Sequence, residues 1–510
     1  MYARSFCGTV YGINGMLVAV ETDIANGLPQ FDLVGLGGSA VKESRDRVRA
    51  ALRNSGFEYP MQRITVNLAP ADLRKEGSGF DLSIAMGILL ASKQIPQRRE
   101  AILLLGELAL DGSLRPVSGV LPILLQAQAE GFTHVILPEQ NAAEAKLAEL
   151  TVLPAASLSA AVKYWSTTLE APEGVEERSD DNSARQSLPD FSLVYGQTFV
   201  KRGLEVAAAG FHNVMLMGPP GSGKTMLATC LPSIMPKMNL DESYDVTKIY
   251  SIAGQLTDKR GLIQERPFRS PHHTVTTAAL VGGGAHSPRP GECSLAHGGI
   301  LFLDEMPEFS RHVLEALRQP LEAGVVTIAR SRHVFTFPAR FLLISSLNPC
   351  PCGFYGSKDQ RECTCTPQQI YRYRAKLSGP LLDRIDLHLE VPRVPVQLLN
   401  ERNAAESSAE IRLRVEAARA IQSKRFANRP AAPFNSAMNG EELRRYCKLD
   451  KEGQELLQMA FDTLGLSARA YDRIVKLART IADLAGAVDI GSAHVAEAIR
   501  YRALDRNIAV

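Results

Sequence analysis

The strongest constraint on the fold of this chain is a glycine-rich loop that joins a short apolar run to a helical segment. Residues 213–217 are typical of a buried strand, and residues 226–231 are typical of a helix. The loop between them comprises Gly218, Pro219, Pro220, Gly221, Ser222, Gly223, Lys224 and Thr225. A strand, a G-x-x-x-x-G-K-T loop and a helix in this order form a P-loop, whose backbone N–H groups surround phosphate oxygens. The segment therefore predicts an α/β domain that binds a nucleoside triphosphate.

Two carboxylates follow a second strand-like run, at residues 299–303. Parallel strands present ligands at their carboxyl ends, so Asp304 is expected near Mg²⁺ and Glu305 is expected to polarise the attacking water. Within the P-loop, Lys224 is expected to reach the β- and γ-phosphates and Thr225 to ligate the same Mg²⁺. A solvated acidic strand end is the alternative for the carboxylates, and the P-loop argues against it. ATP and Mg²⁺ are the predicted cofactors.

A third strand-like run, residues 341–347, ends in Asn348. The Asn348 amide is placed to orient the lytic water or, alternatively, to cap a turn before Pro349. The three strand ends, in this order, resemble the Walker A, Walker B and sensor 1 motifs of an AAA+ ATPase. The resemblance implies an α/β fold, with an AAA+ P-loop core and a C-terminal helical lid.

Two arginines extend the resemblance. Residues 381–386, Leu-Leu-Asp-Arg-Ile-Asp, are similar to the motif with which AAA+ subunits of the helix-2-insert type present an arginine finger to a neighbour's ATP, which points to Arg384. A surface arginine paired with its neighbouring aspartates is the alternative. Ser-Ala-Arg469 resembles sensor 2, which implies a contact with the γ-phosphate in cis. Arg318 is a second candidate for the finger, and Arg473 for sensor 2. A site that acts in trans requires a ring, and the resemblance implies a homo-hexamer.

A basic turn lies between the second and third strands. Residues 325–329 and 334–337 predict a hairpin around Arg330, Arg332 and His333. The hairpin resembles the pre-sensor-1 hairpin that lines the pore of helix-2-insert rings. Repeated around a ring, these side chains would form a positive collar suited to DNA phosphates, whereas a solvated basic turn is the alternative.

Two other segments have patterns that indicate a function less specifically. Residues 269–284 are glycine-rich and match the position of the helix-2 insert, a second pore loop. We favour hydrogen-bonding loop roles for His272 and His273 over metal ligation. Residues 371–376 alternate aromatic and basic side chains, which suits nucleic-acid contacts and packing against a neighbouring subunit equally well.

Four of the eight cysteines gather in one short segment, as Cys350, Cys352, Cys363 and Cys365. Two C-x-C pairs separated by ten residues predict a turn that places four thiolates around Zn²⁺. C-x-C is tighter than the usual C-x₂-C spacing, and a redox-labile thiol cluster or buried free cysteines are the alternatives. A zinc ion here would be structural.

The N-terminal region resembles the Lon-protease fold in residues 106–119 and 131–139. That family uses a Ser–Lys dyad. Ser78 is displaced from the family's serine, whose place Gly79 holds, and no lysine occurs between residues 93 and 146. The dyad is therefore broken, and the domain is expected to bind or to shape the ring without cleaving peptides.

The composition is that of a globular chain, because 45% of the 510 residues are hydrophobic and 22% are charged. The formal net charge is only +2, so any nucleic-acid contact must come from a local patch. No apolar run reaches the roughly 18 residues that span a bilayer, and the N-terminus lacks a secretory pattern. We therefore expect a cytoplasmic protein without a membrane partner.

The predicted organisation has four parts. They are a Lon-protease-like α+β domain of the ChlI type at residues 1–166, an acidic flexible linker at 167–189, the AAA+ α/β core at 190–395 and the helical lid at 396–510. Over nearly its whole length the chain resembles the magnesium-chelatase-like family of AAA+ ATPases, of the ComM/YifB type.

The family resemblance implies a hexameric, ATP-dependent DNA helicase that promotes branch migration during recombination and natural transformation. Its partner would be single-stranded or branched DNA. The alternative is a magnesium-chelatase-like remodeller of a protein partner that does not translocate on DNA. The basic tip of the predicted hairpin favours DNA, and the broken dyad disfavours an ATP-dependent protease.

Overall fold

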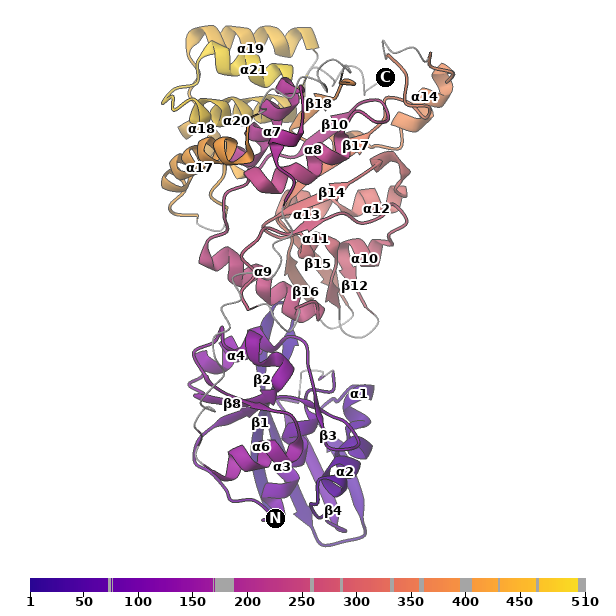
Figure 1. Cartoon of the computed structure of the whole chain (residues 1–510), viewed down its shortest axis with the longest axis vertical. Coiled ribbons are helices and arrows are strands. Elements are labelled where there is room, and N and C mark those ends of the chain that lie inside the picture. The colour runs from indigo at the N-terminus through magenta and orange to yellow at the C-terminus, as the bar shows by residue number, and fades with distance from the viewer. Residues whose placement is uncertain are drawn as a thin grey trace.

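The computed structural model describes residues 1–71, 75, 77–167, 169, 188–256, 261–284, 288–330, 334–356, 362–394, 406–429, 432–464 and 467–502. Most of the predicted linker, 168 and 170–187, therefore lies outside the described residues. Figure 1 shows two bodies stacked along the long axis, with the N-terminal domain at one end and the P-loop domain and C-terminal helices at the other.

The N-terminal domain is built on a seven-stranded mixed sheet in the order β3-β4-β2-β1-β5-β8-β9. The strands are β1 (Tyr2–Tyr11), β2 (Asn14–Ala25), β3 (Gln30–Val34), β4 (Arg63–Ala69), β5 (Ile102–Leu104), β8 (His134–Pro138) and β9 (Thr151–Ala155). The long β1–β2 hairpin is antiparallel, whereas β5, β8 and β9 continue the sheet in parallel. A small hairpin of β6 (Glu107–Leu108) and β7 (Leu114–Arg115) follows β5.

Helices cover both faces of this sheet. They are α1 (Ser39–Lys42), α2 (Ser44–Asn54), α3 (Asp81–Ala91), α4 (Val120–Ala129), α5 (Ala142–Ala145) and α6 (Leu158–Ser166). Every residue of α3 is buried, as expected of a helix with almost no polar face. The Ser5 and Ser83 hydroxyls, 3.0 Å apart, join β1 to α3, whereas Gly8 of β1 lies under Ile123 of α4. Successive residues of a strand alternate between faces, so α3 and α4 lie on opposite sides.

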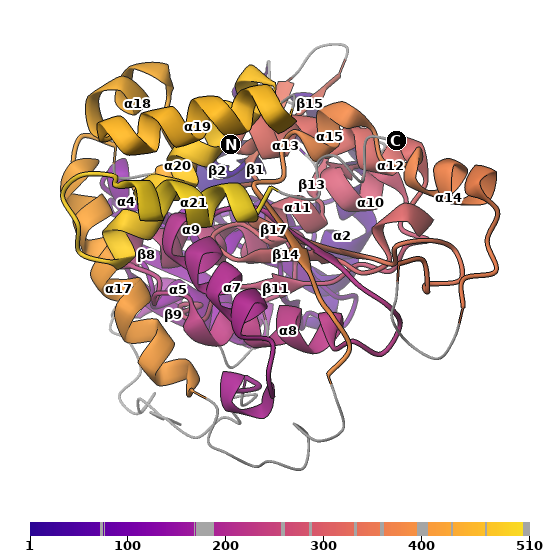
Figure 2. The ribbon, with the colours of Figure 1, turned by 90° about the horizontal axis from the view of Figure 1, so that it is seen from above.

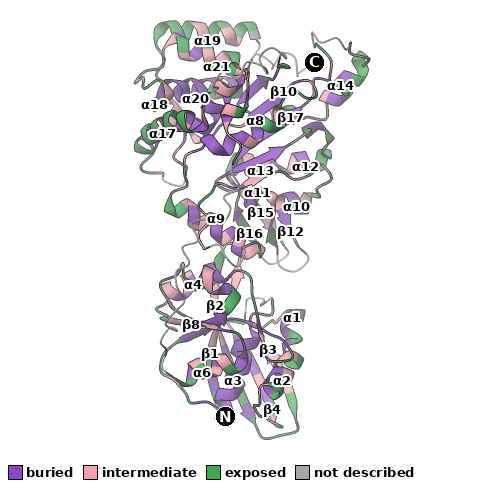
Figure 3. Ribbon diagram, viewed as in Figure 1, coloured by how far each residue is buried: buried purple, intermediate pink, exposed green. Residues whose placement is uncertain are grey.

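The P-loop domain contains a five-stranded parallel sheet in the order β11-β14-β17-β10-β18. The strands are β10 (Val214–Met217), β11 (Phe268–Arg269), β14 (Ile300–Leu303), β17 (Leu342–Leu347) and β18 (Leu387–Glu390). Residues of β10, β14 and β17 are buried throughout, which matches their nearly continuous apolar sequence (Figure 3). The strand order reverses at β10, so the carboxyl ends of β10, β14 and β17 are brought together where parallel sheets bind ligands.

Helices and two hairpins surround this sheet. The helices are α7 (Thr198–Gly210), α8 (Lys224–Cys230), α9 (Leu240–Ala253), α10 (Thr277–Val281), α11 (Glu292–Leu295), α12 (Arg311–Ala316), α13 (Arg318–Ala323), α14 (Pro367–Arg374) and α15 (Gly379–Leu382). The hairpins pair β12 (Gly282–Gly283) with β13 (Arg289–Pro290), and β15 (Val325–Ala329) with β16 (Val334–Pro338). The second hairpin is the one that the sequence predicts around its basic turn.

The C-terminal region is helical. Its helices are α17 (Ser408–Arg425), α18 (Gly440–Tyr446), α19 (Lys451–Leu464), α20 (Ala468–Leu484) and α21 (Ser492–Arg500). Figure 2 shows these helices on one side of the P-loop domain and α14 at the opposite edge. None of the described helices is both long enough and apolar enough to cross a membrane.

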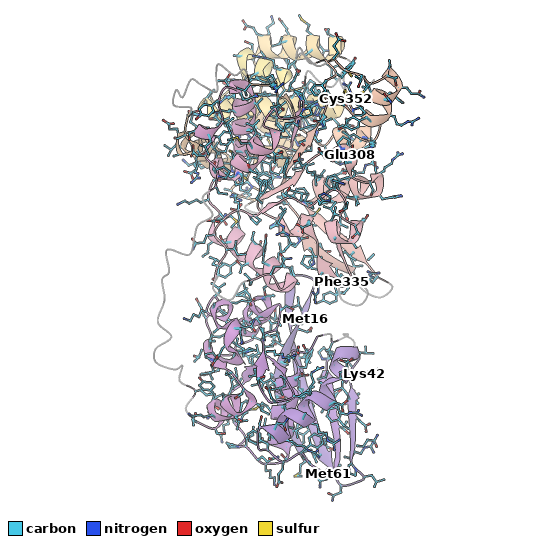
Figure 4. The ribbon with its side chains drawn as sticks, turned by 45° about the vertical axis from the view of Figure 1, so that its right-hand side comes forward. Met16, Lys42, Met61, Glu308, Phe335 and Cys352 are labelled. Atoms are coloured by element: carbon cyan, nitrogen blue, oxygen red, sulfur yellow. The ribbon has the colours of Figure 1, made fainter. Side chains whose placement is uncertain are left out.

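The N-terminal domain contacts the P-loop domain directly. The backbone N–H of Gly119 donates to the Ser251 carbonyl at 3.0 Å. At the tip of the β1–β2 hairpin, the Tyr11 ring lies 4.8 Å from the Phe335 ring of β16, at the junction labelled by Met16 and Phe335 in Figure 4. The two domains therefore meet at the hairpin that carries the basic turn.

Candidate nucleotide site

The loop between β10 and α8 has the backbone conformation of a phosphate cradle. Gly221 and Gly223 have φ values of +74° and +88°, in the left-handed region that favours glycine. A Cβ added at either residue would meet no atom within 4 Å, so the space beside the loop is open. The Ser222 hydroxyl is buried and has no hydrogen-bond partner among the described residues. These features leave room and donors for phosphate oxygens.

Lys224 points into the loop. Its ammonium group donates to the carbonyls of Gly218 and Pro219 at 2.8 and 2.9 Å and to the Asn348 side-chain oxygen at 3.2 Å. Burial lowers the pKa of Lys224, while Asp304 and Glu305 act to raise it. The structure thus brings the predicted Walker A lysine and sensor 1 asparagine together.

The carboxyl end of β14 meets the start of α8. The Thr225 hydroxyl donates to the Asp304 carboxylate at 3.0 Å. A hydroxyl and a carboxylate side by side at the end of a P-loop are the oxygen ligands that Mg²⁺ takes in nucleotide sites. The residues present therefore fit Mg²⁺ bound to a nucleotide, with Thr225 and Asp304 as protein ligands.

Glu305 has φ +50° and ψ +50°, a left-handed conformation that is uncommon for a residue other than glycine. Its backbone N–H donates to the Ser346 hydroxyl at 3.0 Å, and that hydroxyl also contacts the Asp304 carboxylate. Ser346 thus fixes both acidic residues at the end of β14. Strained backbone of this kind occurs at active sites, where it directs a side chain.

Ser346 is a site residue that the sequence motifs did not single out. A signal existed, because Ser345 and Ser346 interrupt an otherwise apolar strand and Ser346 shares a strand face with Asn348 two residues later. Asn213 is another such residue, since its side-chain nitrogen donates to the Arg384 carbonyl and its side-chain oxygen accepts from the Leu343 N–H, both at 2.9 Å. It ties the segment that the sequence predicts to carry the arginine finger to β17 and to the start of the P-loop strand β10.

Among the described residues, none of the predicted arginine side chains hydrogen-bonds to the P-loop. Arg384 contacts the Glu322 carboxylate and donates to the Pro380 carbonyl at 2.6 Å. Arg318 pairs with Glu315 at 2.6 Å. Both finger candidates therefore have an acidic partner within this single chain.

The two sensor 2 candidates differ in their surroundings. The Arg469 side chain is 67% exposed and lies 3.7 Å from the Asp383 carboxylate. Arg473 instead contacts the buried Asp386 carboxylate, which also lies 3.3 Å from the His212 ring. Burial acts to raise the pKa of Asp386, but Arg473 and His212 hold it well below its usual value. Arg473 is thus engaged within the fold, and Arg469 is the more accessible cation.

Of the three basic residues predicted at the hairpin turn, the structure describes only Arg330. Arg330 is exposed, and its guanidinium donates to the Gly284 carbonyl at 2.6 Å, which links the hairpin to the predicted helix-2 insert. Arg332 and His333 lie outside the described residues. In the insert, the His272 ring bonds to the Thr274 hydroxyl at 2.9 Å.

The segment at residues 371–376 falls in α14 and just beyond it. Tyr373 is buried, and burial raises its pKa to about 12. Tyr371 is 62% exposed, and Lys376 pairs with Glu308 at 3.5 Å. One aromatic residue thus packs within the chain, and the other remains on the surface.

Two further clusters carry nucleophilic or metal-ligating groups. The Ser78 hydroxyl contacts the Glu107 carboxylate, and the buried Lys75 ammonium contacts the Pro70 carbonyl. The partner of Ser78 is therefore a carboxylate.

Among the described residues, the one grouping of His, Cys, Asp and Glu able to surround a metal ion consists of Cys350, Cys352, Cys363 and Cys365.

Three family models match successive parts of the chain. "Subunit ChlI of Mg-chelatase" matches residues 20–141, "Magnesium chelatase, subunit ChlI" matches 190–399, and "Magnesium chelatase, subunit ChlI C-terminal" matches 405–502.

Individual proteins are also similar. The chain is 45% identical to "Competence protein ComM" of Haemophilus influenzae, over 97% of this chain and 96% of that protein. It is 44% identical to the uncharacterized protein YifB of Salmonella typhimurium, with the same coverage of 97% and 96%. It is 24% identical to the chloroplastic magnesium-chelatase subunit ChlI of Chlamydomonas reinhardtii, over 52% of this chain and 66% of that protein.

Proposed function

Because this chain belongs to the magnesium-chelatase-like ComM/YifB family of AAA+ ATPases, we propose that it forms a hexameric motor that moves DNA through its ring. The proposed activity is a cytoplasmic DNA helicase that promotes branch migration during recombination and natural transformation. The relative named a competence protein supports a role in natural transformation.

The observation that carries this proposal is the β15–β16 hairpin. Its strands pair in register from Val325 opposite Pro338 to Ala329 opposite Val334, and the exposed Arg330 follows directly after the last strand pair. Val326 at the base is buried in the same apolar cluster as Leu303 of β14 and Leu343 of β17. We therefore expect a change at the ends of β14 and β17 to reach the hairpin through these packed side chains.

In ATP hydrolysis, separate residues of this chain bind the phosphates, bind the metal ion and accept the proton from water. Lys224 and the loop N–H groups bind the phosphates. Thr225 and Asp304 would hold the Mg²⁺, which would neutralise charge on the transferred phosphoryl group. The Glu305 carboxylate accepts a proton from the attacking water, and the Asn348 amide orients that water.

Hexamer formation completes the site in this proposal. Arg384, with Arg318 as the second candidate, acts on the ATP of the neighbouring subunit. Arg384 must exchange Glu322 for a phosphate when the ring forms, and Arg469 contacts the γ-phosphate within its own subunit. The Lon-protease-like N-terminal domains would form a second tier, held against the basic hairpin by the contact between Tyr11 and Phe335.

Equilibrium DNA binding tests the hairpin. Replacing Arg330, Arg332 and His333 with alanine is expected to weaken binding of a labelled forked DNA. The salt dependence of binding should fall by about one counterion for each phosphate that the variant no longer neutralises. The control removes two exposed cations from α2, Arg45→Ala with Arg53→Ala.

Binding that weakens in the hairpin variant and not in the control supports the DNA motor. Equal binding by both variants would refute the role of the hairpin. Active ATP hydrolysis without any DNA binding by the unaltered chain would favour a magnesium-chelatase-like remodeller of a protein partner.

A further inference from the structure

The four cysteines of the β17–α14 connection have the geometry of a single-ion site. The sulfur atoms of Cys350 and Cys352 are 3.3 Å apart, those of Cys350 and Cys363 are 3.7 Å apart, and those of Cys352 and Cys363 are 3.6 Å apart. All four sulfurs, including that of Cys365, lie within 4.8 Å of one another. With Zn–S bonds of about 2.3 Å, the edge of a tetrahedron of sulfurs is about 3.8 Å.

These distances separate zinc from the alternatives. Disulfide bonds require sulfur separations of about 2.05 Å, far shorter than those found here. In a two-iron cluster, two thiolates bind one iron and two bind the other. The sulfur atoms of different pairs would then lie farther apart than they do when all four face a single ion. The sulfur positions therefore fit one tetrahedral ion, and a site with four thiolates favours zinc.

The surroundings also suit thiolates. The backbone N–H of Tyr355 points at the Cys350 sulfur, at 3.3 Å, as an outer hydrogen bond to a metal-bound thiolate would. Cys350 is fully buried, and Cys365 directly precedes Thr366, which caps the N-terminus of α14. One ion would thus fasten the end of β17 to the start of α14.

We propose that Cys350, Cys352, Cys363 and Cys365 bind one zinc ion, and that this ion holds the sensor 1 end of β17 against the P-loop. The inference goes beyond the proposed function, since it holds whether the motor acts on DNA or on a protein. The site is closed by four protein ligands, so the ion is structural.

Two contacts link the cysteine loop to the nucleotide site. Gly353 has φ +87° and lies so close to Pro220 of the P-loop that a Cβ at this position would overlap the proline ring. Cys350 is two residues from Asn348, whose side chain accepts from Lys224 at 3.2 Å.

The far side of the loop is also anchored. The Arg374 guanidinium of α14 donates to the Pro349 carbonyl at 3.2 Å and lies 5.3 Å above the Tyr355 ring. Movement of the cysteine loop therefore displaces both Asn348 and the P-loop wall, so loss of the ion is expected to weaken nucleotide binding.

Metal content and nucleotide affinity test the two parts of the proposal. Protein purified under reducing conditions is assayed for zinc, iron and labile sulfide, and the zinc is titrated out with a mercurial reagent beside a colorimetric zinc indicator. Binding of a fluorescent ADP analogue is measured before and after removal. The variants are Cys352→Ser with Cys365→Ser, and the matched control is Cys447→Ser, a cysteine of similar exposure outside the cluster.

We expect about one zinc per chain in the unaltered protein and in the control, and below about 0.1 in the double variant. Loss of the ion should weaken ADP binding about tenfold, the effect of losing one hydrogen bond to a charged group. If the double variant fails to fold, zinc removal from the unaltered protein still tests whether the ion is present and whether it supports ADP binding.

Absence of zinc, or presence of iron with sulfide, would overturn the metal assignment. Zinc that the double variant retains would overturn the choice of ligands. Unchanged ADP affinity after complete zinc removal would overturn the link to the P-loop. None of these readouts involves DNA, so failure here is distinct from failure of the proposed DNA motor.

Discussion

Replacing Ser346 with alanine probes the part of the site that couples the two acidic residues. The Ser346 hydroxyl accepts a hydrogen bond from the Glu305 N–H at 3.0 Å and contacts the Asp304 carboxylate. A hydrogen bond to a charged group contributes about 1.5–3 kcal/mol and a neutral one about 0.5–1.5 kcal/mol, so the two set an upper limit of about 4.5 kcal/mol. Part of this is recovered by water, and we expect kcat for ATP to fall about 10- to 100-fold.

Ser345→Ala is the matched control, because Ser345 is the preceding residue of the same strand and is equally buried. Its hydroxyl faces away from the site and donates to the Val214 carbonyl at 3.4 Å. Steady-state hydrolysis at saturating ATP is compared with ADP affinity and with the thermal midpoint. Ser346→Thr restores a hydroxyl in a strand-compatible side chain and should recover most of the rate.

A selective loss of kcat in Ser346→Ala, with ADP affinity retained and rescue by threonine, is the expected result. Equal rates in Ser346→Ala and Ser345→Ala would refute a positioning role. A loss of rate that merely follows a lowered thermal midpoint in both variants would do the same.

Further predictions concern the C-terminal helices and pH. Arg473→Ala should destabilise the protein by about 2–3 kcal/mol because the buried Asp386 loses a partner, whereas Arg469→Ala should change stability by less than about 0.5 kcal/mol yet lower ATP turnover. Denaturant unfolding and ATPase assays measure both, and a stability loss in Arg469→Ala alone would contradict this assignment. Burial lowers the pKa of His297 to about 4, from about 6.5 when unfolded, so the unfolded state binds more protons between these values. Stability should therefore fall by about 1–2 kcal/mol from pH 7 to pH 5, and His297→Gln should show a smaller fall; an equal fall in both proteins would disprove it.

The sequence prediction of the nucleotide site depends only on local patterns. Asp304 and Asn348 each follow directly after a short apolar strand, and the loop that ends in Lys224 follows a third. A parallel sheet brings the carboxyl ends of such strands together whatever lies between them in the chain. The strand–loop–helix order around the P-loop needs only neighbouring residues. The prediction of the β15–β16 hairpin rests on local alternation in the same way.

Local sequence patterns did not predict contacts between residues that lie far apart in the sequence. Arg384 contacts Glu322, and the Tyr11 ring lies tilted against the Phe335 ring. The periodicity of a sequence does not indicate which surfaces of separate elements meet. The role of Ser346 depends on the register of β17 beside β14, which pairs Ser345 with Leu303. Register of this kind is fixed by the packed sheet as a whole and cannot be deduced from either strand alone.

Migration of a four-way DNA junction is the most direct test of the proposed motor. Unaltered protein with ATP and Mg²⁺ is compared with Glu305→Gln, which should bind ATP but lack the carboxylate that accepts the proton from water. We predict that the unaltered protein converts the junction to two duplexes and that Glu305→Gln does not. ATP hydrolysis by the unaltered protein without conversion of any junction or forked duplex would contradict a DNA motor.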